Sequence, residues 1–207
     1  MDRFSRFLEI AALCNSQQIN FSSLASDVGM SEKTIAQWFT VLEDTLVAVL
    51  LPCFSKTIKR KSMSAPKLYF FDCGVVNAML SRYSIELSTP EAASALENLV
   101  FTHLQGWCSY GPRGRKLHYW RSVSKEEVDF IVTRDTIPEL AIEVKSTIQP
   151  KPEHFKGLRA FGEEFLRCQK ILLFFTDRAY TTADNIRVEP LGPFLKNGWQ
   201  EFCETEK

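Results

Sequence analysis

Apolar segments in the second half of the chain constrain the fold more than any other feature. The segment at 170–176 is apolar enough to be buried on both faces of a sheet. Strands are expected at 117–121, 128–133, 140–146 and 170–176, and helices from Ala92 and at 154–167. The order helix, three strands, helix, strand predicts an α/β domain in which helices flank a mixed sheet. An edge strand and a terminal helix are expected over 186–202.

Helical periodicity dominates the first half of the chain. Three helices are expected, at 4–14, at 21–28 and from Ser31 through Val49. Ser22 and Ser23 are good capping residues for the second of these helices. Short consecutive helices of this kind are typical of a helix-turn-helix domain.

Two short strand-like segments follow the three helices. The first is an apolar run that ends at Pro52, the second spans 67–71, and a loop over 55–66 joins them. Helices followed by such a pair predict an N-terminal winged helix-turn-helix, with the loop as its wing. The pattern weakens before Pro90, so we place one domain at 1–85 and a second at 86–207.

Local charge is the only electrostatic argument for DNA binding. The chain carries 25 basic and 25 acidic residues, so its net charge attracts no polyanion. The expected wing, however, holds several basic residues and no acidic one, and either a phosphate contact or a solvated loop explains this. The residues predicted to contact DNA are Lys33, Thr34, Gln37, Lys59, Arg60 and Lys61.

Cysteine usage and the N-terminus predict a cytoplasmic protein. The six cysteines are scattered singly, which indicates buried thiols in a reducing compartment. The three histidines do not have the spacing of a zinc site. No secretory signal opens the sequence, and the longest apolar run, residues 46–51, is too short to span a bilayer, so no membrane association is expected.

The strand at 140–146 carries the strongest chemical signal. Its two-residue period places Glu143 and Lys145 on one face, and the preceding strand would bring Asp129 close to them. Charges within apolar strands are costly unless they are paired or bind an ion. Asp129 and Glu143 suit Mg²⁺ or Mn²⁺, and Lys145 could stabilise charge on a phosphate, so hydrolysis of a phosphodiester is the expected reaction.

Each of these residues also has a simpler explanation. Glu143 and Lys145 could form an ordinary ion pair on a half-exposed strand. Glu97, at the border of the apolar stripe of its helix, could hold a metal-bound water as a fourth catalytic residue or be an exposed helical glutamate, which is the commoner case.

Asp129, the Glu143-Val144-Lys145 strand and upstream Glu97 resemble the PD-(D/E)xK nuclease superfamily over residues 92–176. That resemblance implies a restriction-endonuclease-like fold.

The chain is also similar to the C-terminal region of predicted prokaryotic AAA-type ATPases, in which a winged helix precedes a nuclease-like domain of unknown function. The matching stretches are 24–29 with Thr34 and Trp38, 67–74, 96–100, 119–121, 127–130 and 142–146. The chain has no GxxxxGK[ST] phosphate loop, so we expect no ATP hydrolysis from it alone.

Two functions follow from these patterns. The first is a metal-dependent DNA nuclease, a Mg²⁺-dependent phosphodiesterase whose winged helix docks on duplex DNA. The alternative is a non-catalytic DNA-binding or protein-interaction module that acts with an ATPase partner.

Overall fold

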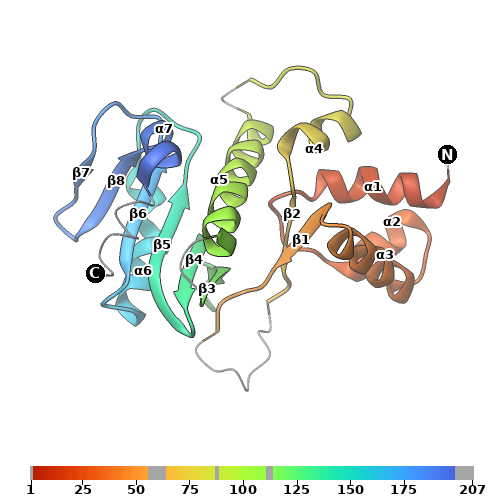
Figure 1. Ribbon diagram of the computed structural model, residues 1–207, viewed down its shortest axis with the longest axis horizontal. Helices are drawn as coiled ribbons and strands as arrows, with labels where there is room; N and C mark the ends of the chain where they lie inside the picture. The colour runs from red at the N-terminus through yellow and green to blue at the C-terminus, as the bar shows by residue number, and fades with distance from the viewer. Residues whose placement is uncertain (1, 56–63, 87–88, 111–113, 199–207) are drawn as a thin grey trace. The chain divides into compact units, whose positions relative to one another are not determined.

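The computed structural model describes residues 2–55, 64–86, 89–110 and 114–198. The chain forms two compact units. The first comprises Met1–Pro52 and Met63–Leu99, and the second comprises Cys53–Ser62 and Val100–Lys207. Each unit is a mixture of helices and strands (Figure 1).

Three helices open the first unit, and each begins at a side-chain cap. The helices are α1 (Arg3–Leu13), α2 (Phe21–Val28) and α3 (Glu32–Asp44). The α2 cap is Asn20, whose side chain accepts the Ser23 N–H at 3.0 Å, so the prediction that Ser22 and Ser23 cap this helix is wrong. Both serines instead lie in the first turn, because Asn20, an equally favourable capping residue, precedes them.

The third helix is shorter than predicted. It ends at Asp44, and Val49 lies in strand β1 (Ala48–Leu51) instead of on the helix. The chain turns at Leu46, which adopts a positive φ of 60°. Strand β1 pairs antiparallel with β2 (Lys67–Phe70), with Val49 opposite Tyr69. The apolar spacing continues across this turn, which explains why the periodicity alone extended the helix too far.

Aromatic side chains fill the core of the first unit. Phe7 and Phe39 meet edge to face with their ring centroids 5.0 Å apart, and both are fully buried. Leu68 and Phe70 bring β2 into the same core. The unit is completed by helix α4 (Cys73–Met79) and by the first part of helix α5 (Pro90–Tyr110), which continues into the second unit.

The second unit contains a mixed sheet, as predicted, and the sheet has six strands. Its strands are β3 (Arg115–Arg121), β4 (Glu127–Arg134), β5 (Ile137–Val144), β6 (Gln169–Phe174), β7 (Tyr180–Thr181) and β8 (Ile186–Pro190). Their order in the sheet is β3-β4-β5-β6-β8-β7. Strands β3, β4 and β5 are antiparallel, whereas β5, β6 and β8 are parallel. Strand β8 is therefore an inner strand, and the prediction of an edge strand after residue 186 is wrong, because the missed strand β7 pairs outside it.

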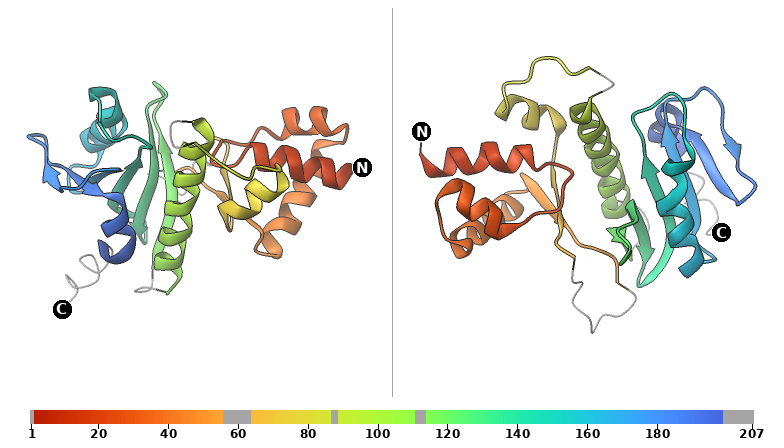
Figure 2. Two further views of the ribbon diagram at one scale, coloured as in Figure 1. Left: turned by 90° about the horizontal axis from the view of Figure 1, so that it is seen from above. Right: turned by 180° about the vertical axis from the view of Figure 1, so that it is seen from behind.

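Helices cover both faces of this sheet (Figure 2). On one face lies α6 (Lys156–Glu164), which follows the short turn η1 (Pro152–Phe155) and packs Leu158 and Phe161 onto the strands. On the other face, Phe101 of α5 lies 6.4 Å from the ring of Phe130. The short helical segments α7 (Leu191–Pro193) and η2 (Phe194–Gly198) follow β8.

The segment that follows β1 belongs to the second unit. Cys53 forms a parallel bridge with Tyr119 of β3, and the Phe54 N–H donates to the Tyr119 carbonyl at 2.6 Å. The Phe54 ring is buried against Phe161 and Phe165. A short piece of chain from the N-terminal half thus completes the hydrophobic core between α6 and the sheet of the second unit.

Candidate active site

Glu143 and Lys145 lie in contact at the end of β5. Glu143 is paired with Leu172 in the parallel β5–β6 ladder, and the Lys145 backbone N–H donates to the Leu173 carbonyl at 2.9 Å. The Lys145 Nζ and Glu143 Oε1 atoms are 2.5 Å apart. The Glu143 side chain is 9% exposed and that of Lys145 is 31% exposed, so the carboxylate is buried and the ammonium reaches the surface.

A β-bulge brings Asp129 to the same place. His118 pairs with Ile131 and Trp120 with Val128, so β4 has one residue more than β3 between these pairs. The regular β4–β5 ladder ends at Phe130 and Ile142, and beyond it the Asp129 Oδ2 atom accepts the Val144 N–H at 3.0 Å. Bulges commonly redirect a side chain in this way beside functional sites. Asp129, Glu143 and Lys145 therefore converge where β4 begins and β5 ends.

The three side chains form a compact anionic site. Asp129 and Glu143 are both buried, and the Lys145 ammonium pairs with the Glu143 carboxylate. Their oxygen atoms are the ligands that Mg²⁺ and Mn²⁺ prefer, so the donor set fits such an ion. Within the described ranges no three His, Cys, Asp or Glu side chains group as a metal site. Backbone oxygens, water or substrate phosphate would have to supply the other ligands, as is usual for Mg²⁺.

His154 is a neighbour of this site that the sequence did not indicate. Burial lowers the pKa of its imidazole, and the Lys145 ammonium lowers that pKa further. Both effects favour the neutral ring, whose Nδ1 atom accepts the Lys151 N–H at 3.1 Å. Its position soon after the strand that carries Glu143 and Lys145 was the only available signal, because nothing in the spacing of the histidines indicated proximity to a lysine.

Glu97 lies in the first unit and has partners there. Its Oε1 atom is 3.1 Å from the Lys67 Nζ and accepts the Tyr69 hydroxyl at 2.5 Å. The Lys67 and Glu97 side chains are 4% and 18% exposed, so Glu97 is not the exposed helical glutamate that was the simpler expectation. A buried ammonium requires such a carboxylate, which gives Glu97 a structural role. Its participation in catalysis stays a prediction.

The predicted DNA contacts are partly within the described chain. Lys33 and Gln37 are exposed on α3. Thr34 is half-buried, and its hydroxyl lies 2.9 Å from that of Ser31, the cap of the helix. The basic residues of the expected wing, Lys59, Arg60 and Lys61, lie outside the described residues.

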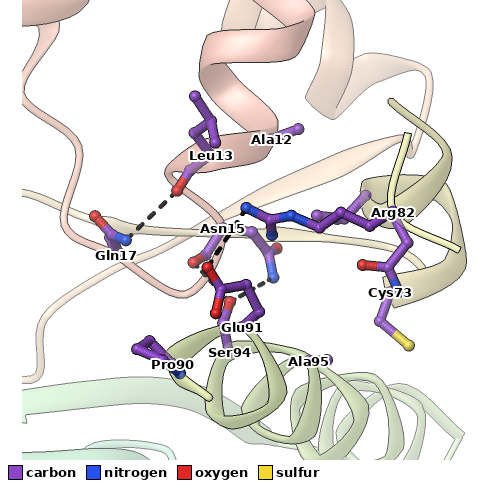
Figure 3. Close-up of a pocket in the computed structure, with 12 residues that line it drawn as sticks. Ala12, Leu13, Asn15, Gln17, Cys73, Arg82, Pro90, Glu91, Ser94 and Ala95 are labelled. Carbon is purple, nitrogen blue, oxygen red and sulfur yellow. Dashed lines mark hydrogen bonds and ion pairs between the residues drawn. The ribbon is translucent and has the colours of Figure 1, made fainter. Parts of the chain in front are cut away.

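A small polar cavity in the first unit is a second place that could bind a ligand (Figure 3). It measures about 90 Å³, and Asn15 and Ser94 cross-link its wall. Arg82 and Glu91 face each other there at 3.8 Å. Ligand pockets usually measure roughly 300–1,000 Å³, so this cavity suits ordered water rather than an organic molecule.

Comparison with known families divides the chain in two. Residues 1–86 match the family model described as Domain of unknown function (DUF8612), and residues 93–194 match that of Domain of unknown function (DUF4143). Two domains of unknown function therefore cover the chain. No curated protein and no solved structure matches it. None of the helices in the described chain combines the length and the apolar character needed to cross a bilayer.

Proposed function

We propose that the second unit is a metal-dependent DNA nuclease of the PD-(D/E)xK class, with a restriction-endonuclease-like sheet. The observation that supports this is the convergence of Asp129, Glu143 and Lys145 where β4 begins and β5 ends. The strand order, with an antiparallel β3–β4–β5 part followed by the α6 crossover to parallel β6, is compatible with this class.

Each residue has a distinct task in the proposed reaction. Asp129 and Glu143 would hold Mg²⁺ or Mn²⁺, which when bound polarises the phosphate and supplies an activated water. The Lys145 ammonium would turn from Glu143 toward the phosphate and donate a hydrogen bond to a non-bridging oxygen. Its partial exposure allows that movement, whereas the buried carboxylates stay fixed. Attack of water on phosphorus then breaks one P–O ester bond, and the leaving oxygen takes up a proton.

The first unit would place DNA at this site as a winged helix-turn-helix. Helix α3 exposes Lys33 and Gln37 on one side while Ile35 and Phe39 are buried on the other. Helices of this kind enter the major groove with polar side chains, and basic residues hold the phosphates.

Replacement of Lys33 by alanine is expected to weaken DNA binding and to reduce its salt dependence. Loss of one phosphate contact lowers the slope of log affinity against log salt by about one. Fluorescence anisotropy with a labelled duplex over a salt series measures this slope. Arg6→Ala is the matched control, because Arg6 is also exposed but lies on α1. Equal slopes for wild type and Lys33→Ala would exclude Lys33 as a phosphate contact.

A non-catalytic module that works with an ATPase partner is the second candidate. The Glu143–Lys145 ion pair favours it, because each charge is already compensated within the protein. The DUF4143 family is known to occur with AAA ATPases, which supports such a partner. The proposed cytoplasmic setting rests on the singly scattered cysteines.

Incubation of the purified chain with supercoiled and single-stranded DNA separates the two candidates. The nuclease is expected to nick or shorten DNA in Mg²⁺ or Mn²⁺ and to leave it intact in EDTA. A well-folded chain that binds DNA but cuts neither substrate with either ion would contradict the nuclease and favour the non-catalytic module.

A further inference from the structure

We infer that the second unit has an anion site that binds a phosphate monoester, at the opposite end of β5 from Glu143. The site is an open pocket of about 280 Å³. Its lining residues are Trp107, Arg115, Arg134, Ile137, Pro138, Glu139, Leu140, Arg167 and Gln169. The pocket is near the lower limit for ligand sites, which indicates a small ligand.

Charge is the feature that identifies the ligand class. Three arginines and one glutamate line the pocket, which gives it a formal charge of +2. A phosphate monoester carries roughly −1.5 to −2 at neutral pH and therefore balances this charge. Guanidinium groups bind phosphate oxygens with paired hydrogen bonds, and arginine is accordingly preferred over lysine at such sites.

The sheet itself brings two of the arginines together. Arg115 of β3 and Arg134 of β4 are directly opposite each other in the antiparallel ladder. Like charges in this position repel, so the pairing requires an anion nearby. Glu139 supplies one, with its Oε2 atom 3.3 Å from the Arg115 Nε and its Oε1 atom 2.6 Å from the Arg134 Nε.

A second bulge positions that glutamate. Val132 pairs with Leu140 and Thr133 with Pro138, so Glu139 is the extra residue of β5. One carboxylate is thus shared between two guanidinium groups. Glu139 and Glu143 are four residues apart on the strand, which separates their Cα atoms by roughly 13 Å. The pocket is therefore distinct from the proposed nuclease site.

The pocket combines a fixed part with an accessible part. The Arg115 side chain is 1% exposed, and its guanidinium lies over the Trp107 ring, 4.7 Å from the centroid. Arg167 is exposed at the rim and forms no ion pair within the described part of the chain. A rigid inner cation and a movable outer one would hold a phosphate between them, while Ile137 and Pro138 offer an apolar surface to the rest of the ligand.

Titration calorimetry with the full chain tests the site. The probes are inorganic phosphate, adenosine 5′-monophosphate and adenosine, which lacks the phosphate. Both phosphate probes are expected to bind at millimolar concentration or below, and adenosine is not. Equal affinity for inorganic phosphate and adenosine 5′-monophosphate would identify the phosphate group alone as the ligand. Tighter binding of adenosine 5′-monophosphate would indicate an additional contact with Ile137 and Pro138.

Arg167→Ala is expected to weaken phosphate binding at least about ten-fold, because a charge-assisted hydrogen bond is lost. Arg178→Ala, another exposed arginine of the second unit, should bind as wild type does. The pocket is distinct from the proposed nuclease site, so failure of the nuclease proposal would leave the proposal of a phosphate site unaffected. Absence of binding by wild type, or unchanged affinity in Arg167→Ala, would overturn the inference.

Discussion

Replacement of Lys145 by alanine is expected to slow DNA cleavage by a factor of about 100–1,000. Loss of one donor to the charge that develops in the transition state has an effect of this size. Lys145 is the only cation among the three converging side chains, and its ammonium lies 2.5 Å from the Glu143 carboxylate. Without it, no group of this set compensates the negative charge that grows on the phosphate. The initial rate of nicking of supercoiled DNA in Mg²⁺ and in Mn²⁺ measures the effect.

The matched control is Lys116→Ala. Lys116 is an exposed lysine of β3 in the same unit, so its loss changes the charge equally without touching the site. Circular dichroism and DNA binding should be unchanged in both variants. A Lys145→Ala protein that folds and cleaves DNA at the wild-type rate would remove Lys145 from the mechanism and weaken the nuclease assignment.

Substitution of Gly157 by alanine is expected to destabilise the fold by about 3 kcal/mol. A Cβ atom at this position would lie 1.8 Å from the Glu127 carbonyl oxygen and 3.5 Å from the Val128 side chain. The first of these is a backbone atom, so neither rotamer change nor side-chain movement relieves the overlap. Helix α6 would have to move away from β4, which opens the core between them. Urea unfolding followed by circular dichroism should show a lower transition midpoint with an unchanged slope.

Gly106→Ala is the control, because its expected effect on stability has the opposite sign. Gly106 lies inside α5, and a Cβ there has no described atom within 4 Å. Alanine stabilises a helix interior by up to about 1 kcal/mol relative to glycine. Equal stability losses in both variants would mean that the contact between α6 and β4 is looser than the structure indicates.

Gly157 packs against residues that neighbour the candidate site in the sequence. Glu127 and Val128, which contact Gly157, immediately precede Asp129. The close approach of α6 therefore fixes the stretch of β4 from which the Asp129 carboxylate reaches the Val144 N–H.

The sequence predicted those elements that local periodicity determines. Helix α2 has the predicted bounds, and the strands before and after α6 lie where apolar residues recur with the expected period. The errors concern features that depend on partners far away in the chain. Strand β7 has only two residues, both exposed, and exists because it pairs with β8. No residue within the 186–190 segment indicates that another strand lies outside it.

In the candidate site, too, local periodicity predicted some features, and others depend on residues far away in the chain. The two-residue period of a strand was sufficient to place Glu143 beside Lys145. The approach of Asp129 depends on a bulge, which no spacing rule predicts, although the short connection to β5 made it reasonable. The partners of Glu97 are Lys67 and Tyr69, some thirty residues earlier, and only the folded chain shows that they meet.

The insertion of Phe54 into the second unit has a consequence for how this protein can be divided or recombined. A single cut near residue 86 would separate this ring from the core that it shares with Phe161 and Phe165. The bridge between Cys53 and Tyr119, which covers the outer edge of β3, would be lost with it. An isolated second unit would therefore expose an unpaired strand edge and the hydrophobic surface that Phe54 covers. Both features promote self-association. A transferable module needs residues 53–55 as well, which makes the two halves inseparable by simple truncation.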